Sequence, residues 1–226
     1  MAKETGTLYV VATPIGNLED ITLRALRILL EVDLIACEDT RVTKKLLKYF
    51  DIETPTVSYH QHSGKPKTDN VIKKILEGEN VALVTDAGTP GISDPGNILV
   101  EAAAEEDIKA VPIPGASALT ALASVSGINM QKFVFLGFPP NKKGREKFFK
   151  ELIEFENPVM YYDSPHRAIK NFELFSSLGG KDFKLIVWRE LTKMFEEIVR
   201  GSVEEVLEYF SANEDKVRGE FVVIVT

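Results

Sequence analysis

Short apolar runs alternate with amphipathic segments through the first half of the chain. The runs predict buried strands at residues 8–12, 33–37, 57–59, 81–84 and 109–112. The segments between them carry apolar residues at helical spacing and predict helices at residues 18–32, 41–49, 69–76 and 98–105. This repeat of strand, turn and helix is typical of a parallel sheet with right-handed crossover connections.

The repeating pattern ends at residues 116–126. This segment consists of small and apolar residues and is predicted to form a helix that connects the first domain to the second. Further strands are predicted at residues 133–138, 159–162, 185–189, 195–200 and 220–225. Further helices are predicted at residues 148–155, 168–178 and 202–210. Because the late strands include a pair compatible with a hairpin, the second sheet is expected to be mixed. The sequence therefore predicts two α/β domains, residues 1–116 with a mostly parallel sheet and residues 117–226 with a mixed one.

The loop after the predicted strand at 81–84 is unusually rich in residues that break regular structure. This cradle loop, residues 86–96, reads DAGTPGISDPG and contains Gly88, Pro90, Gly91, Pro95 and Gly96. Glycine lets a backbone approach a ligand closely, and proline fixes the shape of a loop before the ligand arrives. Open α/β sheets bind small molecules at the carboxyl ends of their strands. The cradle loop is therefore interpreted as a preformed binding element.

Two other predicted strands end in loops of the same kind. Residues 13–17 read TPIGN and residues 112–117 read PIPGAS. Parallel strands carry such loops to one edge of the sheet. One loop of this kind is explained by a tight turn between a strand and a helix, whereas three together favour a ligand site.

The composition of these loops restricts the ligand. Glu38 ends the second strand 22 positions after Gly16, near the place of the ribose-binding acid of a dinucleotide site. However, the first loop lacks the G-x-G-x-x-G pattern, and no G-x-x-x-x-G-K-[ST] phosphate loop occurs. Loops that offer many carbonyl groups and few basic residues suit a ligand with positive charge, such as a sulfonium.

Several motifs, taken in order, resemble a known family. They are TPIGNLEDIT with EDTR, the cradle loop, PIPGASALTALASVSG, YYDSPHR, RELTKMFEE and RGEFVVIV. Over residues 7–225 the chain resembles the bacterial 16S ribosomal RNA (cytidine-2′-O)-methyltransferases of the tetrapyrrole methylase superfamily. It departs from the G-x-G-x-G-D-like first loop of the enzymes that act on tetrapyrroles, and this departure argues against a porphyrinoid substrate.

The resemblance implies a fold of two α/β domains with S-adenosylmethionine in the cleft between them. It implies that the acceptor is the ribose 2′-hydroxyl of a cytidine in the decoding region of 16S ribosomal RNA in the small ribosomal subunit. It also implies a cytoplasmic homodimer. The residues expected at the cofactor are Pro14, Asp86, Ala87, Gly88, Ile92, Ser117, Ala118, Tyr162 and Leu191. For Tyr162 and Leu191, ordinary core packing is the alternative.

Removal of the 2′-hydroxyl proton requires a base, and the EDTR motif supplies the main candidates. Glu38 and Asp39 would orient the ribose or accept its proton, and Arg41 would contact a phosphate. The alternative is that Asp39 or Thr40 caps the following helix. Other candidates for the base lie in the second domain, namely His166 beside Asp163 and Arg167, and the pair Glu190 and Lys193.

A basic segment at residues 141–147 is expected to bind ribosomal RNA phosphates through Lys142, Lys143 and Arg145. The net charge of −7 argues mildly against a nucleic-acid partner. A solvated helix face is the alternative explanation of this segment. His60 and His62, spaced to share one face of a strand, are expected at the rim of the site and are possible RNA contacts.

The remaining composition excludes several classes of protein. Hydrophobic residues make up 44% and charged residues 27%, as is ordinary for globular proteins. One cysteine, Cys37, excludes an internal disulfide framework and fits a reducing cytosol. The sequence contains only three histidines in addition to this cysteine, so no metal site is expected. No apolar run approaches the roughly 20 residues of a membrane span, and the first residues do not form a signal peptide.

Overall fold

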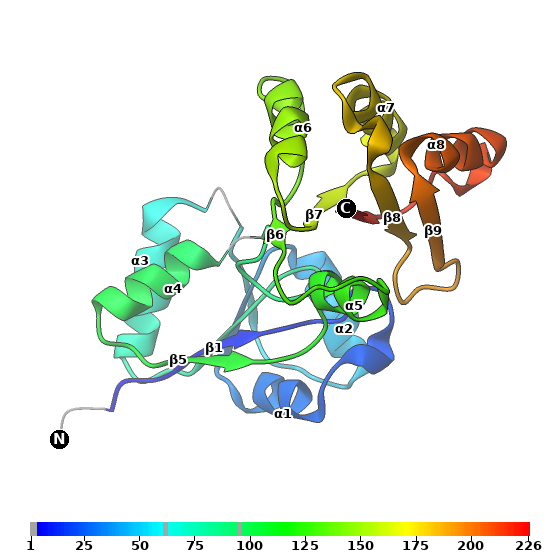
Figure 1. The fold of residues 1–226 in the computed structure, drawn as a ribbon. Helices are drawn as coiled ribbons and strands as arrows, with labels where there is room; N and C mark the ends of the chain where they lie inside the picture. Colours follow the sequence, from blue (N-terminus) through cyan, green and yellow to red (C-terminus); the bar gives the residue numbers. More distant parts are fainter. Residues whose placement is uncertain (1–3, 61–62, 95) are drawn as a thin grey trace. The chain divides into compact units, whose positions relative to one another are not determined.

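The computed structural model describes residues 4–60, 63–94 and 96–226, and the chain forms two compact units. The first unit ends at Ser117 and the second spans Ala118–Thr226, so the predicted division falls one residue earlier. Each unit contains one sheet with helices (Figure 1), the first parallel and the second mixed. The predicted fold class is confirmed.

The first sheet has the strand order β3-β2-β4-β1-β5, and all its strands are parallel. Its strands are β1 (Leu8–Val11), β2 (Leu34–Cys37), β3 (Thr56–Ser58), β4 (Val81–Val84) and β5 (Ala110–Ile113). The helices of this unit are α1 (Leu23–Glu31), α2 (Thr40–Tyr49), α3 (Gly64–Leu76) and α4 (Asn97–Glu105), with a short 3₁₀ helix η1 (Leu18–Asp20).

Both faces of this sheet are covered, which explains why β4 is apolar at every position. Ala82 and Val84 pack with residues of α1 and α2. Val81 and Leu83 point to the other face and pack with residues of α3 and α4. Figure 1 shows α3 and α4 together on one side of the sheet. A parallel strand buried on both sides has no polar face, so its sequence is a continuous hydrophobic run.

The connections of this sheet reverse direction between β1 and β4. From β1 the chain passes through α1 to β2, which lies beyond β4. From β4 it passes through α4 to β5, which lies beyond β1. Ligands of open α/β sheets bind at such a reversal, outside the carboxyl ends of the strands. The loops after β1 and β4 therefore occupy the expected position of a ligand site.

The second sheet has the order β6-β7-β10-β8-β9, in which β6 and β7 are parallel and the other pairs antiparallel. Its strands are β6 (Val134–Phe135), β7 (Val159–Asp163), β8 (Lys184–Arg189), β9 (Glu197–Ser202) and β10 (Phe221–Val225). The helices are α5 (Ala118–Val125), α6 (Arg145–Glu154), α7 (Pro165–Ser177) and α8 (Val203–Ala212), with 3₁₀ helices η2 (Gly180–Asp182) and η3 (Glu214–Lys216).

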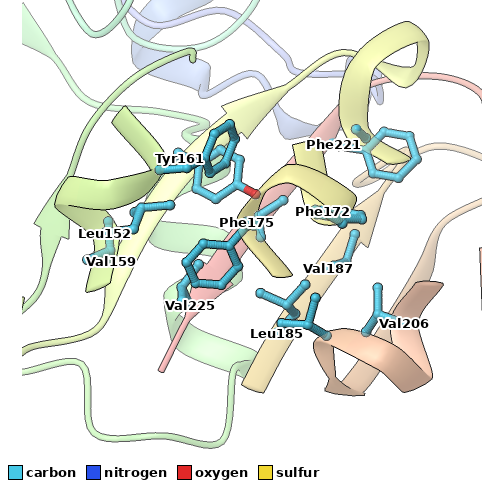
Figure 2. Packing of buried hydrophobic residues seen from close by; sticks show 14 of the residues in the cluster. Leu152, Val159, Tyr161, Phe172, Phe175, Leu185, Val187, Val206, Phe221 and Val225 are labelled. Atoms are coloured by element: carbon cyan, nitrogen blue, oxygen red, sulfur yellow. The ribbon is translucent and has the colours of Figure 1, made fainter. Parts of the chain in front are cut away.

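Aromatic side chains dominate the core of the second unit. In Figure 2, Phe172 and Phe175 of α7 lie beside Leu185 and Val187 of β8, and all four are fully buried. Trp188, the single tryptophan of the chain, is also buried in β8. Its fluorescence is therefore a reporter of the folding of this unit.

The helix predicted at 69–76 begins five residues earlier, since α3 starts at Gly64. Three other predicted helix boundaries are wrong for identifiable local reasons. The helix predicted at 18–32 is interrupted because Thr22 caps α1 by accepting a hydrogen bond from Ala25 N at 3.1 Å. α7 begins at Pro165, since proline suits the first position of a helix. α6 begins at Arg145 after Gly144, which adopts a left-handed conformation with φ 90°. As a result His166 and Arg167 lie in a first helical turn instead of a loop.

A polar network joins β8, β9 and α8 in the second unit. The carboxylate of Glu197 accepts hydrogen bonds from Arg189 Nε at 3.0 Å and from Lys216 Nζ at 2.8 Å. It also accepts a bond from the Tyr209 hydroxyl. Partial burial alone would raise the pKa of Glu197, but the bonds from Lys216, Tyr209 and Arg189 lower it to about 2.

The pH dependence of stability follows from this network. Because the pKa of Glu197 is lower in the folded state, its stabilising effect is present above about pH 4.5 and is lost as the pH falls towards about 2. We expect Glu197→Gln to reduce the free energy of unfolding near neutral pH by about 1–2 kcal/mol, because water screens part of the interaction of this partly exposed group. Urea unfolding followed by Trp188 fluorescence measures this difference, which should shrink between about pH 4.5 and 3. A difference in unfolding free energy that stays constant over this pH range would contradict the lowered pKa of Glu197 in the folded state.

No helix in the described parts of the chain has the length and apolar character needed to cross a membrane.

Candidate functional site

The loops after β1 and β4 are hydrogen-bonded to each other at the switch point. Thr13 N donates to Gly88 O at 2.9 Å, and Gly88 N donates to Thr13 O at 3.0 Å. The buried hydroxyl of Thr13 donates to Thr85 O at 3.1 Å. These bonds hold the start of the cradle loop against the end of β1.

The loop after β5 joins the same group. Thr89 of the cradle loop donates its hydroxyl hydrogen to Ala116 O at 3.2 Å. Gly88 lies between the three loops with φ 84°, a conformation that favours glycine. A Cβ at Gly88 would lie 3.4 Å from Ile15 and 3.9 Å from Ala116 O. The three glycine- and proline-rich loops therefore form one connected backbone surface at the sheet edge.

The end of β2 is tied to the cradle loop by a side chain. The carboxylate of Asp86 accepts a hydrogen bond from Asp39 N at 3.1 Å. Asp39 in turn caps α2, since its Oδ1 accepts from Arg41 N at 2.8 Å. The Arg41 guanidinium also binds the Asp39 carboxylate, with Nη2 at 2.6 Å from Oδ2. The helix-capping interpretation of the EDTR motif is thus correct for Asp39.

The neighbouring carboxylates differ in protonation behaviour. Burial, followed by the charge of Asp86, raises the pKa of Glu38. Burial likewise raises the pKa of Asp86. The Arg41 side chain instead lowers the pKa of Asp39 to about 2. At this edge of the first sheet, Arg41 therefore neutralises the Asp39 carboxylate, whereas Glu38 and Asp86 have no such partner among the described residues.

This arrangement fits a cationic ligand. A cation close to Glu38 and Asp86 would stabilise both carboxylates in the charged form, whereas a phosphate would be repelled. Within the described ranges, no group of three or more His, Cys, Asp and Glu side chains is placed to hold a metal ion. A sulfonium group matches this set of ligands.

The other cofactor residues expected in the first unit lie around the same loops. Pro14 is buried, Ala87 is half-buried, and Ile92 is exposed on the cradle loop. Ser117 is the last residue of the unit, and α5 begins at Ala118 in the second unit.

The cradle loop also borders a cavity of about 580 Å³, whose lining includes His60, Gly91 and Asn97. His62 and Pro95 lie outside the described residues.

Tyr162 and Leu191 belong to the second unit. The Tyr162 ring packs against Phe135 with 4.9 Å between ring centroids, and against Phe138 with 5.4 Å. Leu191 follows β8 and is buried. Their contact with the cofactor stays a prediction.

The polar residues around Pro165 form a structural anchor. Asp163 is 1% exposed, and its carboxylate accepts hydrogen bonds from Ser164 N at 2.8 Å and Asn171 Nδ2 at 2.7 Å. Arg167 lies 4.0 Å from the same carboxylate. His166, in contrast, is exposed in the first turn of α7. Asp163 therefore positions Arg167 and the start of the helix.

Lys193 is poorly suited to accept a proton. Its Nζ lies 3.1 Å from Glu190 Oε1 and 2.9 Å from Glu220 Oε2. Burial would lower the pKa of Lys193, but the two carboxylates outweigh burial and raise it. The lysine is thus held in its charged form.

The three basic residues expected at RNA are not equivalent. Lys142 and Lys143 are exposed in the turn before α6. Arg145 is half-buried, and its buried Nε has no hydrogen-bond partner among the residues that the structure describes. Burial raises the pKa of Asp163, and the charge of Arg145 partly opposes this rise. Lys142 and Lys143 are therefore the better phosphate ligands.

Sequence reasoning missed two kinds of residue. The threonines that connect the loops, Thr13 and Thr85, were detectable as polar residues placed directly after apolar strands. Phe138 was predicted to be the last residue of a strand at 133–138, so its position in a loop was missed. The observed strand β6 contains only Val134–Phe135. The Gly137 before Phe138 and the Pro139 after it were the signal that the strand had ended.

Comparison with known proteins gives a consistent result. The model of the family "Tetrapyrrole (Corrin/Porphyrin) Methylases" matches residues 7–207. A relative from Synechocystis sp. named ribosomal RNA small subunit methyltransferase I is 46% identical, covering 97% of this chain and 78% of the relative. A relative of the same name from Bacillus subtilis is 44% identical, covering 99% and 76%.

Two solved structures share the fold. A cobalt precorrin-4 methyltransferase superposes with a TM-score of 0.69 at 17% identity, covering 97% of this chain and 94% of that one. A diphthine synthase superposes with a TM-score of 0.76 at 14% identity, covering 98% and 90%. At these identities the similarity concerns the fold alone.

Methylases of this family take their methyl group from S-adenosylmethionine, the cofactor of this chain. Its sulfonium is a cation of the kind that the Glu38 and Asp86 carboxylates favour. The parallel and mixed sheets, the connected loops at the β1–β4 switch point and the full-length sequence matches agree, and the chain belongs to the tetrapyrrole methylase family.

Proposed function

We propose that this chain methylates ribosomal RNA of the small subunit, at the ribose 2′-hydroxyl of a cytidine in the decoding region. The observation that carries the proposal is the 44–46% identity, over nearly the whole chain, to relatives named ribosomal RNA small subunit methyltransferase I. The choice of the cytidine 2′-oxygen rests on the TPIGNLEDIT and EDTR motifs. The proposed substrate puts the enzyme in the cytoplasm, and the homodimer implied by the family resemblance stays a prediction.

In the proposed reaction, Glu38 accepts the proton of the 2′-hydroxyl. A general base acts best when its pKa is close to the working pH, and burial together with Asp86 raises the pKa of Glu38 towards that range. Glu38 is also the half-buried acid of the EDTR motif, and Arg41 binds the other acid, Asp39, instead. Asp39 is the weaker candidate because Arg41 binds both of its oxygens.

Asp39 and Arg41 have a positioning role in this proposal. The Asp39 carboxylate holds the start of α2 and orients the guanidinium. The Arg41 side chain is 87% exposed, so it remains accessible to a phosphate of the RNA. Arginine suits this contact because its planar donor groups match phosphate oxygens.

We further propose which residues contact S-adenosylmethionine. The contacts assigned to it are Pro14, Asp86, Ala87, Gly88, Ile92, Ser117, Ala118, Tyr162 and Leu191. The connected loops at Thr13, Gly88 and Ala116 support the first-unit part of this set, since they offer a rigid backbone surface. RNA phosphates are assigned to Lys142 and Lys143, with Arg145 in a secondary role.

The test is to incubate unmodified small ribosomal subunits with S-adenosylmethionine that carries a labelled methyl group. We expect one labelled cytidine in the decoding region, at a linkage that resists alkaline hydrolysis because its 2′-oxygen is blocked. Label on a base instead of a ribose would contradict the 2′-oxygen assignment.

Two other outcomes would point to a different function. RNA of unchanged mass, with cofactor bound, would indicate a nucleotide-binding regulatory module without chemistry. In a separate incubation, an absorbance change on mixing with a porphyrinoid and cofactor would indicate a methyltransferase whose acceptor is a tetrapyrrole. The same incubation with isolated 16S ribosomal RNA distinguishes naked RNA from the assembled subunit as substrate.

A further inference from the structure

An exposed aromatic side chain lies at the end of β6 in the second unit. Phe138 is 51% exposed although it is a large apolar residue. Its ring lies on Tyr162, with 5.4 Å between ring centroids and an interplanar angle of 58°. Tyr162 is supported in turn by Phe135 at 4.9 Å. Phe138 therefore presents a ring surface on a packed aromatic base.

The loop that carries Phe138 is held in place by hydrogen bonds. Tyr162 N donates to Gly137 O at 2.8 Å, on the residue before the ring. Arg167 donates to Pro139 O at 3.1 Å, and its guanidinium also bonds the side chain of Asn141. The buried Asp163 carboxylate lies 4.0 Å from this guanidinium. A ring fixed in this way loses little conformational entropy when it binds a partner.

The residues that follow Phe138 in sequence include basic ones, and their charge indicates the kind of partner that the ring binds. Lys142 and Lys143 are exposed four and five positions after Phe138, and residues 137–145 contain no acid. The nearest acid in sequence, Glu146, is paired with Lys150 at 2.6 Å. An exposed aromatic face followed within five positions by two exposed lysines is a combination that suits single-stranded nucleic acid, in which bases stack and phosphates are neutralised.

We propose that an unpaired base of the substrate RNA stacks on Phe138, while Lys142 and Lys143 contact the adjoining phosphates. This inference rests on the proposed function, since it assigns part of the RNA-binding surface of that enzyme. It divides the binding energy into a stacking part that is insensitive to salt and a phosphate part that depends on salt.

The experiment measures binding to unmodified small ribosomal subunits over a range of potassium chloride concentrations at constant magnesium. Phe138→Ala should weaken binding by about tenfold at every salt concentration, so that the plot of log affinity against log salt shifts without a change of slope. The double variant Lys142→Gln/Lys143→Gln should reduce the slope. Phe138→Trp should restore affinity, because the larger ring still stacks.

Phe195 provides the matched control. It is 68% exposed in the β8–β9 connection of the same unit, but it is followed by Glu196 and Glu197. Phe195→Ala should leave RNA affinity unchanged. Equal losses for Phe195→Ala and Phe138→Ala would overturn the inference, because they would reflect nonspecific apolar contact.

Three further results separate the possible failures. Weaker S-adenosylmethionine binding by Phe138→Ala would assign the ring to the cofactor site and overturn the inference. Wild-type RNA affinity in Phe138→Ala, with methylation intact, would overturn the inference and leave the proposed function standing. A wild-type protein that neither binds nor methylates the subunit would overturn the proposed function itself.

Discussion

The Glu38→Gln protein is expected to fold and bind S-adenosylmethionine, but to methylate the small subunit about 10²–10⁴-fold more slowly than the wild type. Glutamine has nearly the same shape as glutamate but removes the negative charge and the ability to accept a proton. Saturating cofactor offsets any weaker attraction of the sulfonium, so the remaining loss of rate reports the proton transfer. The acidic limb of kcat/KM for the cofactor, which reports the enzyme before the cofactor binds, should lie at higher pH than for an ordinary carboxyl group, because burial and the charge of Asp86 raise the pKa of Glu38. This limb should be absent from the variant.

Asp39→Asn is the matched variant for this test. Asparagine also caps helices well, so the start of α2 should be preserved. Only the ion pair with Arg41 is removed, and the loss of rate should be much smaller than for Glu38→Gln. Single-turnover rates with saturating cofactor measure both variants. A wild-type rate in Glu38→Gln would reject Glu38 as the base, and an equal loss in Asp39→Asn would assign the base to both acids together.

Asp163→Ala is expected to reduce the free energy of unfolding of the second unit by about 3–5 kcal/mol. The carboxylate is almost fully buried and binds Ser164 N and Asn171 Nδ2, and it faces Arg167 at 4.0 Å. Its removal leaves the donor groups of Ser164 N and Asn171 Nδ2 without this acceptor and takes away the negative charge that faces Arg167. Such an unpaired group costs more than the bond itself contributes.

Urea unfolding followed by Trp188 fluorescence measures this loss, since the tryptophan lies in the same unit. Glu146→Ala is the control, because Glu146 forms only an exposed pair with Lys150 on α6. Exposed pairs of this kind contribute little, so its unfolding curve should overlay that of the wild type. Overlay of the Asp163→Ala curve as well would show that Asp163 does not anchor the unit.

The alternation of strands and helices was readable from local patterns. Apolar runs such as residues 81–84 predict buried strands, and the helices between them predict the parallel arrangement that the first sheet has. The glycine- and proline-rich loops were readable for the same reason, since turn chemistry is encoded in a few adjacent residues. Helix starts at Arg145 and Pro165 were missed because both follow residues that resemble loop.

The roles of individual acids could not be separated in this way. Glu38 and Asp39 are adjacent in sequence, and both were equally good candidates for the base. Their difference arises from Arg41, which binds Asp39, and from the surroundings of Glu38, where burial and the charge of the distant Asp86 raise its pKa. A local pattern contains no information on which side chain will meet such a distant partner.

The order of strands and helices, the two α/β units, the breaker-rich loops and the family resemblance were all present in the amino-acid sequence, because they depend on neighbouring residues. The tertiary structure alone showed that Thr13, Gly88 and Ala116 connect three loops. It alone showed that Arg41 neutralises Asp39 but not Glu38, and that the ring of Phe138 is exposed to solvent. Burial and charge pairing are properties of residues brought together from distant parts of the chain, and they exist only once the chain has folded.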